Sequence, residues 1–376
     1  SVASNVPRLD YSNGDCPSLL LEPQSTNLIT YSEDFSQSAW FNSRGRITID
    51  SNSIISPNGN LNGSKITPTN ENNAHYLRNG TSSYSDGVSR TFSIFLKYGN
   101  ENKNIKISYL NKTLLVNFNA NGVLNYVSNT SQSYNIEEYE SGWYKVSVTD
   151  TVSGGGFLYT GIQTENNQDG TSFFYIWGAQ LEENSFSTSY IPTLTGTTQT
   201  RVAETCGGAG DSSSINSEEG VLYAEINTNT DSTDKAINIS NSTGNNRIWI
   251  GYSTSSKRVY ALGYSSGSLQ FALFKTLTDE SDFIKIALKY KENDFALWVD
   301  GSLVGSDLSG ATPIGLSKLG FDLGISSGFF YGNCTDLRVY NTALTDEELI
   351  YLTGTLGEDY YDNYLEMSNN LNYTIQ

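Results

Sequence analysis

Two stretches give the clearest local signals of structure: FALWVDGSLVGS, residues 295–306, and TDLRVYNTALTDEELIYLTG, residues 335–354. In the first stretch alternate residues are large and apolar up to Val299, which is the period of a β-strand with one buried face. The pair Asp300-Gly301 tolerates the positive φ angles of a two-residue type I′ turn. This stretch therefore predicts a β-hairpin.

The second stretch predicts a closing strand followed by a short helix. Leu337 and Val339 alternate with polar residues and point to one face of the strand. Thr345 is placed to cap the helix, and Glu348, three residues later, can reach back to the amide of the cap. Gly354 can end the helix. The two stretches together indicate one β-sandwich.

Composition favours β-structure and excludes some partners. The 376 residues include 22 Lys and Arg against 40 Asp and Glu, a formal net charge of −18. Nucleic acid and anionic membrane surfaces need a basic protein surface, so we expect neither as a partner. Only 16% of residues are charged, and the abundant Ser, Thr, Asn, Gly and Tyr suit strands joined by tight turns. No run of eighteen apolar residues occurs, so no segment is expected to insert into a membrane.

Short strands recur along the chain with no long helical period, so the predicted fold class is all-β, with two antiparallel β-sandwich (jelly-roll) domains in tandem. The lead-in is expected to pack along the first domain through its apolar residues 19–21. The predicted parts are an extended lead-in (1–24), a jelly roll like a carbohydrate-binding module (25–195), a linker rich in Gly, Ser and Thr (196–218), a second sandwich (219–356), and an acidic, Tyr-rich tail (357–376).

Two resemblances to known families add to this prediction. The hairpin, the DLRVYN strand and the capped TDEEL helix resemble the laminin-G/concanavalin-A-like sandwich family over about residues 220–354. The strings PRLDYSNGDCPSLLLEPQSTNLITYSEDFSQSAW (residues 7–40) and YIWGAQLEENSFSTSYIPT (residues 175–193) are similar to those that bracket a jelly roll in bacteriophage tail-fibre and head-spike proteins. These resemblances imply that the protein is a bacteriophage tail-fibre or head-fibre adhesin, which is extracellular and lies on the virion surface. Its expected partners are host cell-surface polysaccharide and other virion proteins. The resemblances also imply that the protein is a homo-oligomer, specifically a trimer.

The sequence offers no recognisable catalytic constellation, so we expect a non-enzymatic protein. The single histidine, His75, lies in the polar stretch NENNAHYLRNG and is expected to be an exposed loop residue without catalytic partners, and no GxSxG motif occurs. A virion-associated polysaccharide depolymerase, with a carboxylate pair as in glycosidases, is one alternative. A purely structural protein that decorates the virion is another.

The cysteines Cys16, Cys206 and Cys334 have no metal-binding or redox spacing and are expected to be unpaired, with a Cys16–Cys206 pair as the alternative.

Glycan binding requires exposed aromatic faces with amide or acid groups nearby. On this criterion the candidate carbohydrate-binding residues are Trp143, Tyr76, Tyr126, Trp40, Trp249 and Tyr331. Ordinary packing is the alternative for each of them, and for Trp40 we favour a lid over the core. No cofactor is expected except a structural calcium ion, which many sandwich modules carry. The candidate ligands are Glu33, Asp34 and Glu182, although no EF-hand spacing supports them.

Overall fold

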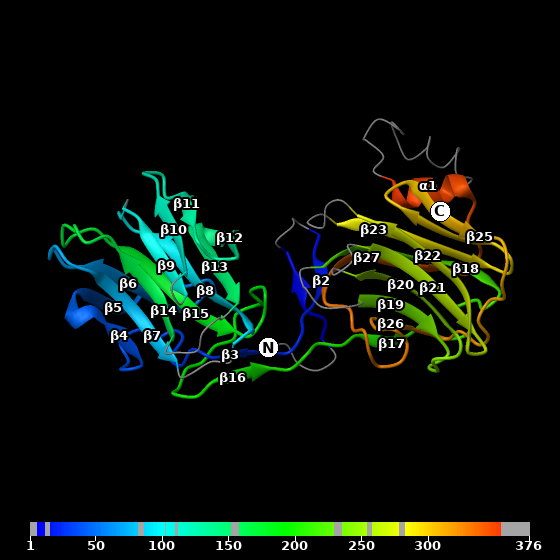
Figure 1. Cartoon of the computed structure of the whole chain (residues 1–376), viewed down its shortest axis with the longest axis horizontal. Helices are drawn as coiled ribbons and strands as arrows, with labels where there is room; N and C mark the ends of the chain where they lie inside the picture. Colours follow the sequence, from blue (N-terminus) through cyan, green and yellow to red (C-terminus); the bar gives the residue numbers. More distant parts are fainter. Residues whose placement is uncertain are drawn as a thin grey trace. The chain divides into compact units, whose positions relative to one another are not determined.

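The computed structural model describes most of the chain in two compact units. One unit is residues 24–202, and the other joins residues 1–23 to residues 203–376, so we call them the inserted unit and the discontinuous unit. The predicted fold class is confirmed, because both units are built from antiparallel sheets (Figure 1). The described residues are 6–11, 16–81, 86–101, 103–109, 112–151, 158–228, 235–253, 258–277 and 283–354.

Two six-stranded antiparallel sheets form the inserted unit. The first has the strand order β11-β10-β9-β14-β7-β4, and the second has the order β12-β13-β8-β15-β6-β5. The strands are β4 (Trp40–Asn42), β5 (Ile47–Ile55), β6 (Leu61–Pro68), β7 (His75–Thr81), β8 (Ser89–Tyr98), β9 (Ile105–Tyr109), β10 (Lys112–Phe118), β11 (Leu124–Asn129), β12 (Ser133–Tyr139), β13 (Trp143–Thr151), β14 (Leu158–Thr164) and β15 (Phe174–Glu182). Short 3₁₀ turns lie at Ser43–Gly45 and Glu140–Gly142.

The core of the inserted unit follows from strand alternation. Ile94 on β8, Val146 on β13 and Ile107 on β9 point inward and are fully buried. The FFYIWGAQL segment has two apolar faces, which suits a central strand. It forms β15, which lies inside its sheet between β8 and β6.

Two sheets also form the discontinuous unit, one of seven strands and one of six. Their orders are β1-β2-β27-β18-β23-β24-β25 and β17-β26-β19-β20-β21-β22. The strands are β1 (Leu9–Asp10), β2 (Ser18–Leu21), β17 (Gly207–Ala209), β18 (Glu219–Asn227), β19 (Lys235–Ser240), β20 (Arg247–Ser253), β21 (Arg258–Ser265), β22 (Ser268–Thr276), β23 (Ile284–Lys291), β24 (Phe295–Val299), β25 (Ser302–Asp307), β26 (Lys318–Gly320) and β27 (Gly332–Tyr340).

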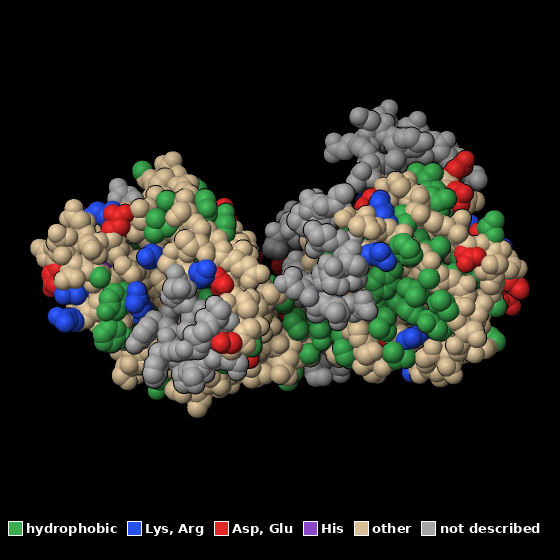
Figure 2. All heavy atoms as spheres, viewed as in Figure 1, with side chains coloured by type: hydrophobic (Ala, Val, Ile, Leu, Met, Phe, Trp, Pro, Cys, Tyr) green, Lys and Arg blue, Asp and Glu red, His purple; other side chains and the backbone are tan. Residues whose placement is uncertain are grey.

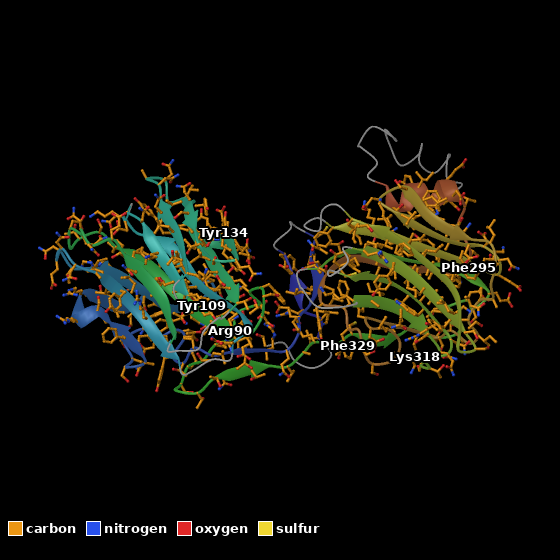
Figure 3. The ribbon with its side chains drawn as sticks, viewed as in Figure 1. Arg90, Tyr109, Tyr134, Phe295, Lys318 and Phe329 are labelled. Atoms are coloured by element: carbon orange, nitrogen blue, oxygen red, sulfur yellow. The ribbon has the colours of Figure 1, made fainter. Side chains whose placement is uncertain are left out.

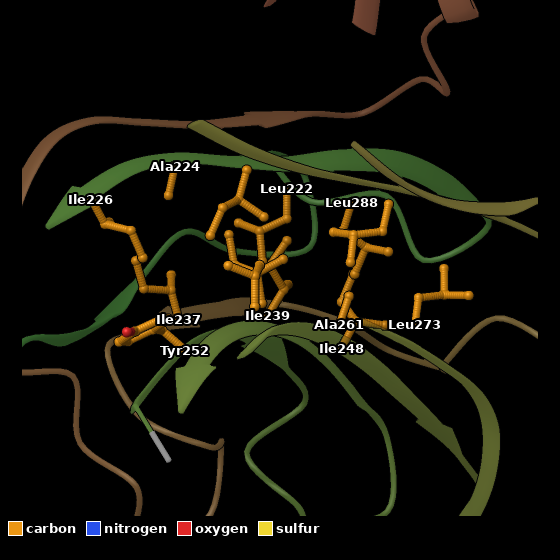
Figure 4. Packing of buried hydrophobic residues seen from close by; sticks show 14 of the residues in the cluster. Leu222, Ala224, Ile226, Ile237, Ile239, Ile248, Tyr252, Ala261, Leu273 and Leu288 are labelled. Carbon is orange, nitrogen blue, oxygen red and sulfur yellow. The ribbon is translucent and has the colours of Figure 1, made fainter. Parts of the chain in front are cut away.

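Aliphatic side chains from the two sheets meet between them. Leu222 and Leu288 come from the seven-stranded sheet, and Ile237, Ile239 and Ile248 come from the six-stranded sheet (Figure 4). All five side chains are fully buried, so the burial of apolar surface is the main stabilising contribution to this unit.

The hairpin and the helix predicted from local chemistry are confirmed. Asp300 and Gly301, between β24 and β25, have φ angles of 48° and 75°, as a type I′ turn requires. Helix α1 (Asp346–Thr353) begins with a capping box between Thr345 and Glu348. It covers the outer face of the seven-stranded sheet, where Leu349 packs in one cluster with Trp298.

The lead-in does not pack where the sequence analysis placed it. Strand β2 pairs with β27, with Leu19 opposite Cys334, and Leu21 belongs to the core of the discontinuous unit. The prediction that residues 19–21 pack along the first domain is therefore wrong. An apolar run indicates burial but does not identify which core receives it. The Arg8 guanidinium bonds Glu22 at 2.5 Å and Glu204 at 2.7 Å and ties the segment down.

The segment expected to be a linker contains two short strands. Strand β16 (Gln199–Arg201) pairs with β3 (Ser25–Asn27), and β17 pairs with β26. The amide of Glu204 donates to the carbonyl of Glu22 at 3.0 Å, and both residues belong to the discontinuous unit. The tail, residues 357–376, lies outside the described residues. Within the described part, no helix has the length and the apolar character needed to cross a bilayer.

Candidate functional site

The three tryptophans proposed as sugar contacts are buried. Trp143, at the start of β13, is 1% exposed and packs with Phe95 and Trp177 on the outer face of its sheet. Its indole N–H donates to the carbonyl of Ile55 at 3.1 Å. Tyr144, the next residue on the strand, points to the core instead. Neighbouring side chains cover that outer face, so Trp143 has no surface to offer a sugar.

Trp40 and Trp249 are also used in packing. The Trp40 indole donates to the carbonyl of Tyr31 at 3.0 Å, and its ring lies 4.8 Å from that of Phe35 in the core, which is the lid role favoured above. Trp249 lies on the outer face of β20 beneath the Arg247 guanidinium, 4.6 Å from its ring centroid, and stacks on Tyr264. In Figure 2 hydrophobic side chains gather over the region where Figure 1 draws β20–β22.

Tyr126 is the most exposed of the six candidates. It is 49% exposed on β11 and stacks on Tyr134 of β12, with ring centroids 4.9 Å apart and an interplanar angle of 13° (Tyr134 is labelled in Figure 3). This pair bridges the edge strands of the two sheets. Tyr331, which precedes β27, is half-buried against the core of the discontinuous unit. Burial raises the pKa of its hydroxyl.

Tyr76 belongs to a group of four side chains on the outer face of the first sheet of the inserted unit. Tyr76 and Arg78 come from β7, Phe41 from β4 and Gln163 from β14, and we call these four residues the β4-β7-β14 platform. The Arg78 guanidinium lies 4.2 Å over the Tyr76 ring and donates from Nη2 to Oε1 of Gln163 at 3.0 Å. Phe41 lies beside Tyr76, with ring centroids 5.8 Å apart.

The platform combines the groups that sugar recognition needs. Phe41 is 52% exposed and presents an apolar ring, while Arg78 and Gln163 supply hydrogen-bonding groups next to it. The sequence analysis missed Phe41. Its alternation with the buried Trp40 in the stretch WFN, which places it on the opposite face, could have identified it.

His75 is not the exposed loop residue that the sequence predicted. It opens β7, faces inward opposite Thr164 and is fully buried. Its Nε2 lies 3.3 Å from the hydroxyl of Thr69. Strand β7 begins at His75, inside the stretch expected to be a polar loop, so His75 takes the inward position that Leu77 repeats two residues later.

The carboxylates proposed as calcium ligands each bond neighbouring protein groups. Glu33 accepts from Tyr190 and Asn62, and burial raises the pKa of its carboxyl group. Glu182 is fully buried and accepts from Ser25 at 2.6 Å. Asp34 accepts from Ser36 and Gln37. Among the described residues, no group of three or more His, Cys, Asp or Glu side chains is arranged to hold a metal ion. The three cysteines are free, as expected.

No protein-family model and no curated protein matches the chain. Solved structures give partial likenesses. Leech intramolecular trans-sialidase with 2,7-anhydro-Neu5Ac matches at 21% identity over 39% of this chain, with a TM-score of 0.32, and the match spans only 25% of that enzyme. Carbohydrate-binding module CBM66 from Bacillus subtilis matches at 11% identity over 37% of this chain and 75% of its own, with a TM-score of 0.24. Mouse laminin α1 domains LG4-5 match at 10% identity over 73% of this chain and 90% of their own, with a TM-score of 0.28. TM-scores this low do not establish a shared activity.

Proposed function

We propose that the protein is a non-enzymatic glycan-binding protein and that the β4-β7-β14 platform is its sugar-binding surface. The observation that carries this proposal is the half-exposed Phe41 ring beside an arginine and an amide that are already held by Tyr76 and by each other. Sugars place their C–H faces on such rings and their hydroxyl groups on such donors and acceptors.

Preorganisation supports the platform as a binding site. The Arg78 guanidinium is fixed by the Tyr76 ring on one side and by Gln163 at its end, so binding a ligand would cost little side-chain entropy. The platform also lies on paired strands, which hold functional side chains more rigidly than loops do.

The biological setting follows from the resemblance of residues 7–40 and 175–193 to bacteriophage fibre proteins. On that basis we propose a tail-fibre or head-fibre adhesin at the virion surface that attaches to host polysaccharide. The same resemblance suggests a homotrimer that contacts other virion proteins. Light scattering of the purified chain would test the trimer, and labelling of purified particles with an antibody against the chain would test the virion location.

A glycan array probed with the purified full chain tests the proposed binding. The expected result is specific binding to one group of glycans with no release of reducing sugar from the bound polymer. New reducing ends would favour a depolymerase instead. Failure of the folded protein to bind any glycan, together with capture of virion proteins, would favour a structural role.

A further inference from the structure

The platform holds an arginine whose hydrogen-bonding capacity is largely unused. Of the five N–H groups on its guanidinium, Arg78 uses one on the Nη2 nitrogen to bond Gln163, and its Nε is buried with no hydrogen-bond partner. The guanidinium, which is planar, lies over the Tyr76 ring. A planar fork of this kind matches the two oxygens of a carboxylate.

A second cation, Lys106, lies on the same face of the sheet, among the cross-strand partners of Tyr76 and Gln163. The strand pairing places Tyr76 opposite Gln163, and Gln163 opposite Lys106 of β9, so that all three point to the outer face. Lys106 is two strand spacings, about 10 Å, from Tyr76. In the neighbouring row Gly161 lies opposite Arg78 and contributes no side chain, because the backbone of β7 at Leu77 and Arg78 packs closely against it.

Within the described part of the chain, neither cation is neutralised by an acidic side chain. Among the described residues no ion pair involves Arg78 or Lys106, although Arg46 pairs with Glu71 in the same unit. The chain as a whole has 40 acidic against 22 basic residues, so acidic side chains that could pair with a cation are abundant. The carboxylate at the border of this face, Glu165, instead accepts a hydrogen bond from Asn104 at 2.7 Å.

We infer that the β4-β7-β14 platform binds an acidic glycan, with a sugar carboxylate held by Arg78 and attracted by Lys106, and the sugar ring placed on Phe41. This inference rests on the proposed function and specifies the class of its ligand.

The test uses an array of oligosaccharides that contain uronic acids or sialic acids, printed beside the same oligosaccharides after reduction of the carboxyl group. We expect the full chain to bind members of the acidic set at least about tenfold more tightly than their reduced forms, because hydrogen bonds to charged groups are the strong ones. Equal or tighter binding of the reduced or other neutral glycans would overturn the inference and leave the proposed function intact. Binding to no glycan at all would overturn both.

The variant Arg78→Gln tests whether Arg78 is responsible for the preference for acidic glycans, and Lys65→Gln is its matched control. Lys65 lies over the ring of Phe173 at 4.3 Å on the other sheet of the same unit, so each variant removes one cation from an aromatic ring. We expect Arg78→Gln to weaken binding of the acidic glycan by about 10- to 100-fold and to weaken binding of its reduced form much less, because only the acidic form loses a charged partner. Lys65→Gln should bind as the wild type does. An unchanged preference for the acidic form in Arg78→Gln, with thermal unfolding confirming a folded protein, would overturn the inference.

Discussion

The substitution Leu21→Ala tests whether the N-terminal strand belongs to the discontinuous unit. Leu21 is 5% exposed and lies opposite Gly332 at the junction of β2 and β27. Truncation of a buried leucine costs about 2–5 kcal/mol, and a site near a sheet edge can partly collapse, so we expect about 3 kcal/mol. For a unit of this size that corresponds to a loss of about 6–12 °C in Tm.

Hydrogen exchange followed by mass spectrometry shows which unit is affected. In Leu21→Ala the amides of β18 and β27 should lose protection, while those of β8 and β15 keep it, because these strands belong to different units. Leu9→Ala is the control, since Leu9 on β1 is 47% exposed and should change stability by less than about 0.5 kcal/mol. Loss of protection in β8 and β15, or no loss anywhere, would refute this assignment of the lead-in.

Three further substitutions test other parts of the structure. Thr345→Ala removes the helix cap and should cost about 1 kcal/mol in denaturant unfolding; no change would mean that the cap is not formed in solution. Burial raises the pKa of Glu33, so stability due to its neutral form is present at low pH and is lost as the pH rises through the folded-state pKa. Glu33→Gln should therefore raise Tm at neutral pH but not below about pH 4, and equal shifts at both would contradict this. Trp143→Phe loses the bond to Ile55 and should cost about 1–3 kcal/mol while glycan binding stays unchanged; loss of binding by the folded variant would restore Trp143 as a candidate.

Local backbone chemistry was sufficient to predict the hairpin and the helix start. Asp300-Gly301 and Thr345 were identified correctly because a turn and a cap depend on a few neighbouring residues. The position of the lead-in could not be predicted in the same way, because Leu21 pairs with a strand more than 300 residues later in the chain, and an apolar run fits either core.

The candidate site also depends on contacts between distant parts of the chain, which the sequence does not predict. Trp143 was a candidate because of its residue type and its neighbours in the sequence, which do not reveal that Phe95 and Trp177 pack against it. The platform depends on three strands that bring Phe41, Arg78 and Gln163 together, and the sequence gives no information about their register. Only Tyr76 of this group was identified from the sequence, on the basis of its neighbouring asparagines.

The outer face formed by β4, β7 and β14 is proposed to bind a glycan. Calorimetric titration of Phe41→Ala and Phe274→Ala, with the glycan that binds the wild-type chain, tests this claim. The two phenylalanines are similarly exposed, at 52% and 55%, but lie in different units. Loss of the ring contact in Phe41→Ala should weaken binding by about tenfold, and Phe274→Ala should bind as the wild type does. Unchanged binding by Phe41→Ala, or a loss confined to Phe274→Ala, would contradict the claim.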